Sequence, residues 1–275
     1  MREPANPRER ADRQRALTSG ELPSRRAGAE RCLPAPEQAI RLSGVLERIR
    51  RQRAHETKPP LVVFDLDGTL IDNRPRSTVI MQELGAVWQT RFPEHSELLR
   101  NAHPDGIGYL FRENLRTFGV CDNDQLAEAI EFWKARFFSD RFLCHDRATP
   151  GAVEFARACY EARATLVYLT GRDLPNMALG SLSSLRDLGF PIGVSGTEFV
   201  MKPDPEISDE AFKRNVMPEL GRSGEVVAAF DNEPGHCNAF VACFPEAAVF
   251  LLDTQHLPGA PPLDPSVTVI ATFCR

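Results

Sequence analysis

The chain has 275 residues, of which 42% are hydrophobic and 26% are charged, and its formal net charge is −5. This composition is ordinary for a soluble globular protein, and the length suffices for one or two domains with a sizeable core. No apolar run approaches the ~18 residues that a membrane-spanning helix needs, and the N-terminus lacks the apolar segment of a secretory signal. We therefore expect no membrane partner and a cytoplasmic location.

The cysteine pattern and the uneven charge exclude further classes. The seven cysteines are scattered, odd in number and never spaced CxxC, which argues against a disulfide framework or a zinc ribbon and favours a reducing compartment. Residues 1–58 carry fourteen basic side chains against eight acidic ones, a net of +6, so the remainder of the chain carries −11. Because the body is acidic, we expect no nucleic-acid partner.

The N-terminal region divides into two parts. Residues 1–33 are rich in Arg, Ala, Pro and Glu and poor in large apolar residues, which predicts a disordered basic tail. Residues 34–58 carry apolar side chains at helical spacing between Pro36 and Ala54, and we expect an amphipathic helix docked on the core. A short basic amphipathic helix that meets a membrane surface or a partner is the alternative interpretation.

The stretch from Leu61 to Leu70 is the strongest local signal. Four apolar residues lead into Asp65 and Asp67, and a Gly-Thr turn follows at once, which is typical of a strand buried on both faces. Side chains at i and i+2 of an extended segment lie on the same side, so the two carboxylates face one space. Close carboxylates repel each other unless a proton or a cation intervenes, and a divalent metal is the natural partner.

Residues 74–147 predict a small helical domain. Helical segments are expected at Thr78–Arg91, Glu94–Ala102, Ile107–Phe118 and Asn123–Ser139, separated by turn-prone sequences. Both tryptophans and many of the phenylalanines lie in this region, enough for a core of its own.

The pattern becomes regular from residue 148 to residue 275, where apolar strands alternate with helices of ordinary length. Such alternation implies right-handed crossovers and a mostly parallel sheet. We predict an α/β fold, a Rossmann-like three-layer core formed by residues 59–73 and 148–275, with the small α-helical domain inserted into it. The details include extended segments at Ile192–Val194 and Glu198–Met201, and a helix at Ser208–Met217 that ends at Pro218.

Polar groups follow three further predicted strands, as they follow the first. The clusters are Thr170-Gly171-Arg172-Asp173, Lys202-Pro203-Asp204 and Asp231-Asn232-Glu233. Because the carboxyl ends of parallel strands share one edge of a sheet, these groups are expected to converge with Asp65 and Asp67. An acid pair, a hydroxyl beside a glycine, a lysine and another acid cluster together fit phosphoryl transfer, which depends on positioning and electrostatic stabilisation.

With these motifs the sequence resembles the haloacid dehalogenase superfamily over roughly residues 60 to 255. The motifs that carry the resemblance are, in order, Asp65-Leu66-Asp67-Gly68-Thr69-Leu70, Leu169-Thr170-Gly171-Arg172, Lys202-Pro203 and Asp231-Asn232-Glu233. The first is a strong signal, whereas Thr170, Lys202 or Asp231 alone would be weak.

The resemblance implies a role for each residue. Asp65 is the implied nucleophile, which forms an aspartyl-phosphate, and Asp67 is the implied general acid and then base. Thr170 and the Gly171 amide are implied to hold phosphate oxygens, and Lys202 to offset negative charge. A Mg²⁺ cofactor is implied to bind the Asp65 carboxylate, the Asp67 backbone carbonyl and Asp231. Dehalogenase members lack an acid at the position of Asp67, so this residue favours a phosphatase.

The fourth motif departs from the usual pattern of the superfamily. A paired acid, or a second acid three to five residues after the first, is common there, but Pro234, Gly235 and His236 occupy the later positions here. Either Asn232 or Glu233 must complete or orient the metal site, and the sequence leaves both open. Arg172 either contacts substrate or pairs with a nearby group, and His236 is expected to be exposed.

The expected function is a Mg²⁺-dependent phosphatase that hydrolyses a small phosphorylated metabolite. The spacing of the motifs leaves room for an extra domain only between Asp67 and Thr170, so residues 74–147 are expected to form a cap over the active site. Two alternatives stay open: a phosphosugar mutase of the same superfamily, and a non-catalytic binding protein that retains the fold. The sequence indicates no oligomeric state.

Overall fold

The computed structural model describes residues 32–55 and 58–275, and it confirms the predicted α/β fold class. Six parallel strands form the main sheet in the order β5-β4-β1-β6-β7-β8. Their bounds are β1 Pro60–Phe64, β4 Thr165–Asp173, β5 Thr197–Lys202, β6 Glu225–Asp231, β7 Ala248–Leu252 and β8 Thr268–Ile270. The disordered tail expected for residues 1–33 lies almost wholly outside the described residues.

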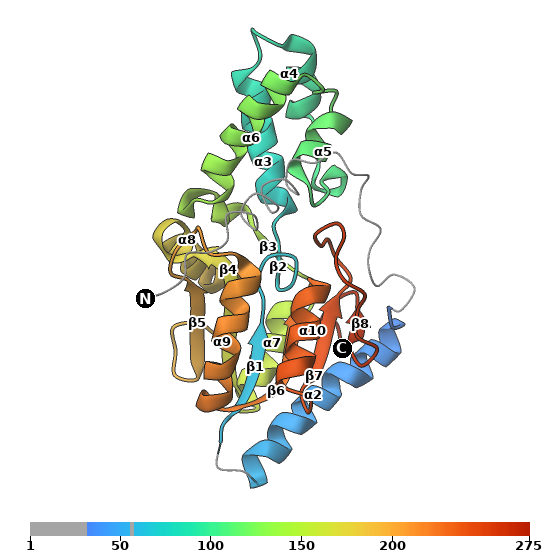
Figure 1. Ribbon diagram of the computed structural model, residues 1–275, viewed down its shortest axis with the longest axis vertical. Coiled ribbons are helices and arrows are strands. Elements are labelled where there is room, and N and C mark those ends of the chain that lie inside the picture. The colour runs from blue at the N-terminus through green and yellow to red at the C-terminus, as the bar shows by residue number, and fades with distance from the viewer. Residues whose placement is uncertain (1–31, 56–57) are drawn as a thin grey trace.

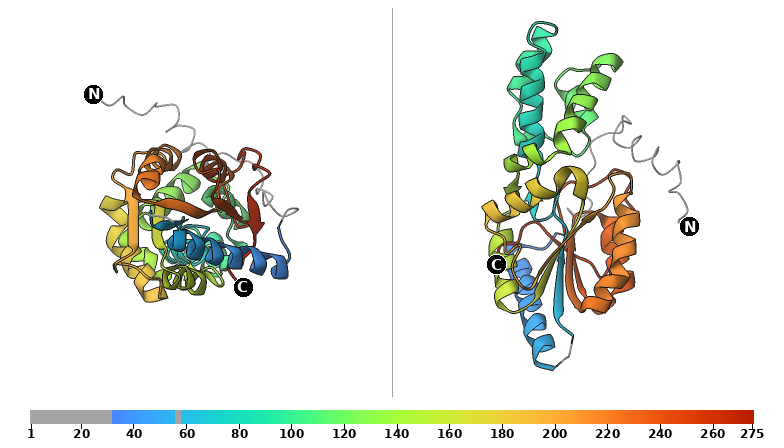
Figure 2. Two further views of the ribbon diagram at one scale, coloured as in Figure 1. Left: turned by 90° about the horizontal axis from the view of Figure 1, so that it is seen from below. Right: turned by 90° about the vertical axis from the view of Figure 1, so that its left-hand side faces the viewer.

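Helices cover both faces of this sheet, which gives three layers (Figures 1 and 2). Helices α2 (Ala35–His55) and α7 (Ala152–Glu161) pack on one face, where their apolar side chains join those of β1, β4 and β6. Helices α9 (Asp209–Ser223) and α10 (Pro234–Cys243) cover the other face. Helix α8 (Leu174–Leu188) packs against β4 and β5 at the β5 side of the sheet.

Helix α2 packs on the core through one apolar stripe. The stripe recurs at i, i+3, i+4 and i+7 and consists of Leu42, Val45, Leu46 and Ile49. All four are buried in the apolar cluster between the sheet and the helices α2 and α7. Ile40, which lies off this stripe, is 70% exposed. Burial of each large apolar side chain contributes about 1.5–3 kcal/mol, so the stripe holds the helix in place.

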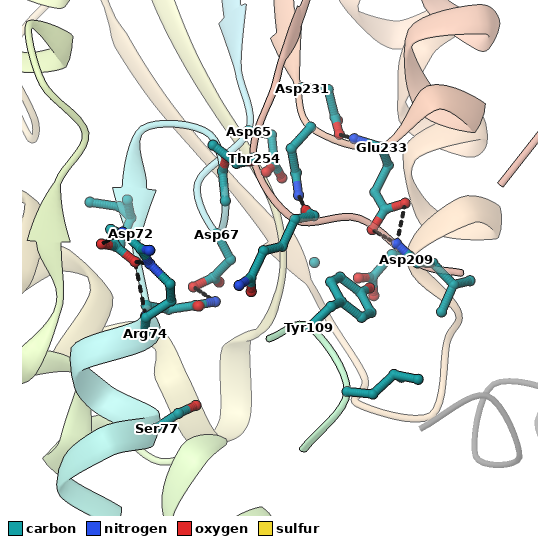
Figure 3. A pocket seen from close by; sticks show the side chains of 18 of the residues that line it. Asp65, Asp67, Asp72, Arg74, Ser77, Tyr109, Asp209, Asp231, Glu233 and Thr254 are labelled. Carbon is teal, nitrogen blue, oxygen red and sulfur yellow. Dashed lines mark hydrogen bonds and ion pairs between the residues drawn. The ribbon is translucent and has the colours of Figure 1, made fainter. Parts of the chain in front are cut away.

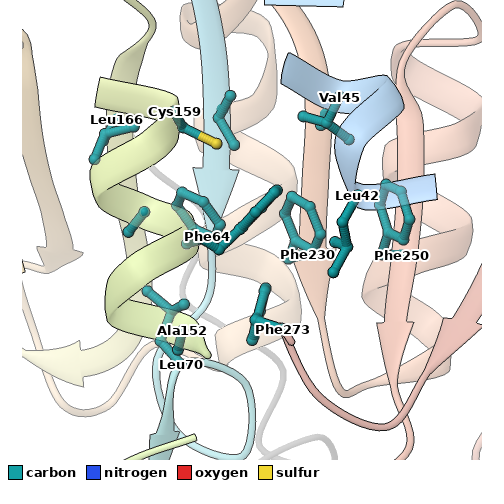
Figure 4. Close-up of a cluster of buried hydrophobic side chains, with 14 of the residues drawn as sticks. Leu42, Val45, Phe64, Leu70, Ala152, Cys159, Leu166, Phe230, Phe250 and Phe273 are labelled. Carbon is teal, nitrogen blue, oxygen red and sulfur yellow. The ribbon is translucent and has the colours of Figure 1, made fainter. Parts of the chain in front are cut away.

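An aromatic row runs across the centre of the same face (Figure 4). Phe64 pairs in register with Phe230, and Phe230 with Phe250, on the adjacent strands β1, β6 and β7. Their rings stack with centroids 5.1 and 4.6 Å apart, and Phe273 packs against both Phe64 and Phe230. The row fixes the register of the strands whose ends carry the polar motifs.

Residues 74–146 form a helical insert that lies beyond the carboxyl ends of the strands (Figure 1). It contains α3 Arg74–Val87, α4 Pro93–Arg100, α5 Phe111–Thr117, α6 Asn123–Phe137 and the 3-10 turns η1 Pro104–Gly106 and η2 Asp140–His145. A separate apolar cluster, which includes Trp88 and Trp133, fills it. A short antiparallel ribbon of β2 (Ile71–Asp72) and β3 (Arg147–Ala148) joins the insert to the core.

Local details differ from the sequence-based expectations. Helix α9 does not end at Pro218 but continues to Ser223. Proline costs about 3 kcal/mol inside a helix, but the turn beyond it buries Leu220 against the sheet, and tertiary packing outweighs the local preference. Residues 192–194 form no strand, and α5 begins only at Phe111, four residues after the expected start.

Within the described residues, no helix combines the length and the apolar character required to cross a membrane.

Candidate active site

The polar motifs meet at one edge of the sheet. Lys202, Thr170, Asp65 and Asp231 belong to or directly follow β5, β4, β1 and β6, which are four adjacent strands in that order. They line a cavity of about 1790 Å³ between the sheet and the insert. Asp67, Gly171, Asn232 and Glu233 line the same cavity, so the structure brings every predicted site residue to one place.

Asp65 is held by the turn that follows β1. Its backbone N–H donates to the carbonyl of Phe230 at 2.9 Å, and the Thr69 hydroxyl donates to its Oδ2 at 3.0 Å. Gly68 has φ +82°, and a Cβ at this position would collide with the amide of Asn232, so the turn requires glycine. The turn therefore fixes the carboxylate at the base of the cavity (Figure 3).

Lys213, on α9, joins Asp65 to Asp231, and sequence reasoning missed it. Its Nζ donates to Asp65 Oδ1 at 2.7 Å and to Asp231 Oδ2 at 2.6 Å, and the lysine is 2% exposed. A signal was present, because Lys213 shares a helical stripe with the buried Met217 and Leu220. We call Asp65, Lys213 and Asp231 the lysine cluster.

The lysine cluster contains two carboxylates but only one ammonium group. Burial raises the pKa of Asp65 to about 7, helped by the neighbouring Asp231 and opposed by Lys213. Burial acts in the same sense on Asp231, but Lys213 and His236 outweigh it and hold the pKa of that carboxyl well below its usual range. The cluster thus contains one more carboxyl group than ammonium groups.

Asp67 lies in a second group of buried charges. Arg172, on β4, donates to Asp67 Oδ2 through Nε at 2.7 Å and to Oδ1 through Nη2 at 2.9 Å. Arg76, on α3 of the insert, donates to Oδ1 at 2.5 Å. Although burial opposes them, the two guanidiniums hold the pKa of Asp67 well below its usual range.

Asp146 completes this second group. It accepts from Arg76 Nε at 2.9 Å and from Arg172 Nη2 at 2.8 Å, and its side chain is fully buried. We call Asp67, Arg76, Asp146 and Arg172 the arginine cluster. Two arginines and two aspartates make it neutral overall. The sequence left open whether Arg172 contacts substrate or pairs with a nearby group. In the structure it pairs with Asp67 and Asp146.

Thr170 and Lys202 lie on strands β4 and β5, on the side of Asp65 away from Asp231. Thr170 is buried, and its hydroxyl accepts from the Arg172 N–H at 3.2 Å. Lys202 does not contact the lysine cluster: its Nζ donates to the Ile207 carbonyl and pairs with Asp209, both at 3.0 Å. The Asp209 carboxylate in turn lies against Gly171.

The residues after Asp231 have partners of their own. Asn232 donates to the Gln255 carbonyl at 2.5 Å, and its Oδ1 accepts from the Thr69 hydroxyl at 3.3 Å. The Glu233 carboxylate accepts from Leu257 N–H, and Tyr109 of the insert donates its hydroxyl to it. The sequence-based choice between Asn232 and Glu233 as a metal residue stays a prediction.

The prediction that His236 is exposed is wrong, because this residue packs against the lysine cluster. Its Nδ1 is 3.2 Å from Asp231 Oδ1 and 3.3 Å from Lys213 Nζ, and its side chain is largely buried. The first turn of α10 places it there, five residues after the strand ends.

The donor set fits Mg²⁺. Among the described residues, no three His, Cys, Asp or Glu side chains are arranged to hold a metal. Mg²⁺ needs only one or two carboxylates, because water and substrate oxygens complete its octahedron. Asp65 and Asp231 supply two, and a divalent cation would offset the charge that the lysine cluster leaves unbalanced.

Comparisons with known proteins agree with this geometry. Residues 59–234 match the model of the haloacid dehalogenase-like hydrolase family. A Clostridium difficile protein that carries a provisional phosphatase name is 14% identical, with a TM-score of 0.51 over 79% of this chain and 96% of that one. Protein Tyrosine Kinase A of Mycobacterium tuberculosis is 19% identical, with a TM-score of 0.50 over 78% and 95%. At such identities the likeness shows the fold alone. No curated protein matches the chain.

Proposed function

The chain belongs to the haloacid dehalogenase-like hydrolase family, and on that premise we propose that it is a Mg²⁺-dependent phosphatase. Its substrate would be a small phosphorylated metabolite, and the reaction would pass through an aspartyl-phosphate on Asp65. The observation that carries the proposal is the lysine cluster, in which Lys213 holds Asp65 and Asp231 together at the ends of two adjacent strands.

In the first half-reaction, the Asp65 carboxylate would attack the phosphorus atom while the bond from phosphorus to the leaving oxygen breaks. Asp67 would give its proton to that oxygen, and the products are a free alcohol and an aspartyl-phosphate. Two arginines make Asp67 a strong acid once it is protonated. The negative charge of a phosphate in the cavity would offset the arginines and favour the protonated form.

In the second half-reaction, water would attack the phosphorus atom of the aspartyl-phosphate. Asp67, now a carboxylate, would accept a proton from this water, and the bond from phosphorus to the Asp65 oxygen would break. Inorganic phosphate and the Asp65 carboxylate are then restored, and Asp67 is again protonated for the next turnover.

The remaining residues would stabilise charge. We assign to Lys213 the charge-neutralising role that the sequence suggested for Lys202, because Lys213 contacts the nucleophile. Thr170, the Gly171 amide and Lys202 line the cavity beside Asp65 and are proposed to hold phosphate oxygens. Mg²⁺, held by the Asp65 and Asp231 carboxylates and the Asp67 backbone carbonyl, would act as a Lewis acid that offsets charge on the phosphate.

The helical insert is proposed to be the cap of this active site. It contributes Tyr109, Phe137 and Phe138 to the wall of the cavity, opposite the motif residues. A wall of this kind shapes the space for the leaving group and excludes water during transfer. We also propose a cytoplasmic location, because none of the seven cysteines, each within the described part of the chain, is joined in a disulfide bond.

The test is release of inorganic phosphate from a panel of phosphorylated metabolites, with and without Mg²⁺. Asp65→Asn is the matched control, since it keeps the shape of the side chain and removes the nucleophile. We expect Mg²⁺-dependent release by the wild type and a loss of about 10⁴-fold or more in the variant. Equal, low activity of the two proteins on every substrate contradicts the proposal, and isomer conversion without phosphate release would indicate a mutase.

A further inference from the structure

We propose that Arg76, a residue of the insert, is a positioning residue for proton transfer by Asp67. It fixes the Asp67 carboxyl so that Oδ2, and not Oδ1, exchanges the proton with the leaving group and with water. The inference rests on the proposed phosphatase function and adds to it a residue from outside the sequence motifs.

The contacts of Arg76 span three parts of the chain. Its Nη2 donates to Asp67 Oδ1 at 2.5 Å, next to the nucleophile turn. Its Nε donates to Asp146 Oδ1 at 2.9 Å, where the chain leaves the insert, and its Nη1 donates to the Phe137 carbonyl at 2.9 Å. The guanidinium also lies over the Phe137 ring, 4.0 Å from its centroid, and the side chain is fully buried. A group held at four points has one orientation.

The two oxygens of Asp67 have unequal surroundings. Oδ1 accepts from Arg76, from Arg172 at 2.9 Å and from the Asn73 amide at 3.2 Å. Oδ2 accepts only from Arg172 Nε among the described residues. A carboxylate oxygen offers about two lone-pair sites, so Oδ1 is saturated and Oδ2 keeps one free. The side chain of Asp67 is 28% exposed and lines the cavity, where the leaving group and water would meet it.

Arg76 makes the strongest contribution to this asymmetry, because the Asn73 amide, the other donor to Oδ1 alone, is uncharged and lies further away at 3.2 Å. Arg172 contacts both oxygens and holds the carboxylate from the core. Arg76 adds a donor to one oxygen only, and it does so from the insert, since it lies in the first turn of α3 just after the connecting ribbon. Packing of the insert on the core thereby becomes a condition for the correct orientation of the proton-transferring group.

Substrates with different leaving groups distinguish a positioning role of Arg76 from a merely structural one. An alkoxide leaves only if it is protonated, whereas p-nitrophenolate leaves without help, so only the alkyl phosphate requires Asp67 in the first half-reaction. Hydrolysis of the aspartyl-phosphate requires Asp67 for both substrates. Misplacement of Asp67 therefore lowers kcat/KM for alkyl phosphates alone, and it slows the second step for both.

The experiment compares the best alkyl phosphate of the panel with p-nitrophenyl phosphate, using Arg76→Lys and Arg76→Met. Lysine keeps the charge but cannot reach all of the partners, and methionine keeps most of the packing over Phe137. Arg136→Lys is the matched control. Arg136 also lies in the insert, bonds a carboxylate (Glu83, 3.1 Å) and a carbonyl, and covers a ring, but it does not contact Asp67. Asp67→Asn gives the size of the full effect.

For Arg76→Lys we expect kcat/KM to fall about 10- to 100-fold on the alkyl phosphate and less than about threefold on p-nitrophenyl phosphate. A burst of p-nitrophenolate should precede the steady state, because the aspartyl-phosphate accumulates. Arg136→Lys should leave kcat/KM unchanged for both substrates.

Three results overturn the inference: an equal loss on both substrates, no loss on either, or the same split in Arg136→Lys. Circular dichroism and thermal unfolding show whether each variant is folded, and Arg76→Lys carries the test if Arg76→Met does not fold. If the wild type hydrolyses neither substrate, the proposed function fails instead.

Discussion

Two clusters of buried charge meet at the same cavity, and they are built on different principles. The lysine cluster lies wholly in the core, on β1, β6 and α9, and its two carboxylates share one ammonium group. The arginine cluster draws Asp67 and Arg172 from the core and Arg76 and Asp146 from the insert and its exit. Its charges balance.

The two clusters therefore differ in what they can bind: the lysine cluster can still bind a cation, whereas the charges of the arginine cluster already balance. Buried charge without compensation is costly, so the lysine cluster favours an additional cation when both carboxyls are ionised. Burial is also the main cause of the raised pKa of Asp65. The arginine cluster, with its two arginines, gains nothing from a further cation. It holds two parts of the chain in one geometry, and it is expensive to break.

The largest expected effect on activity is in the lysine cluster. Lys213→Met leaves the two carboxylates without their shared cation, and we expect kcat to fall about 10²- to 10³-fold. Lys202→Met is the comparison, and its kcat should fall less because Lys202 pairs with Asp209 and does not contact Asp65. Phosphate release at saturating Mg²⁺, normalised to folded protein, measures both. A greater loss in Lys202→Met would restore the assignment made from sequence.

The next effect is on stability, in the arginine cluster. Asp146→Asn leaves two buried guanidiniums with one carboxylate, and we expect the free energy of unfolding to fall by about 3–5 kcal/mol. The double variant with Arg76→Met should cost less than the sum of the single changes, because each removes the other's unpaired partner. Urea denaturation of the four proteins measures this coupling. Additivity within about 0.5 kcal/mol would mean that the cluster does not act as a unit.

The smallest expected effect is the stabilisation of the fold by Mg²⁺, and it tests the difference between the two clusters directly. Mg²⁺ at about 100 times its Kd should stabilise the folded wild type by about 2.7 kcal/mol, and thermal unfolding with and without Mg²⁺ measures this. Asp231→Asn, in the unbalanced cluster, should lose this gain, whereas Asp146→Asn, in the balanced cluster, should keep it. A gain lost equally in both variants would contradict the distinction between the clusters.

Local patterns predicted the fold well because they report what the strands bury. The apolar runs of β1, β4 and β6 are visible as such, and so are the polar residues that end them. Pro218 shows where local reasoning fails: the rule that proline ends a helix describes an isolated segment, whereas α9 continues because Leu220 packs on the sheet.

The candidate site was predictable only where its members lie in the carboxyl-terminal part of a strand or just after it. Asp65, Thr170 and Asp231 do so, and the parallel topology brings them together. Lys213 reaches the same place from the middle of a helix, so its role depends on how α9 lies on the sheet. The arginine cluster joins residues separated by up to 105 positions, and no spacing in the sequence indicates such a set.

The narrow ribbon of β2 and β3 has a consequence for how the chain folds. Residues 65–164 separate β1 from β4, which must pair side by side, yet the insert begins and ends at paired positions of the ribbon. If the insert folds first, the flexible chain between the two strands shrinks to about a quarter of its length, which lowers the closure cost by roughly 1.2 kcal/mol. Pulse-labelled hydrogen exchange tests this order, and protection of β4 before α3 and α6 would refute it. An insertion of this form therefore makes the pairing of β1 with β4 easier during folding, although it lengthens the chain between them.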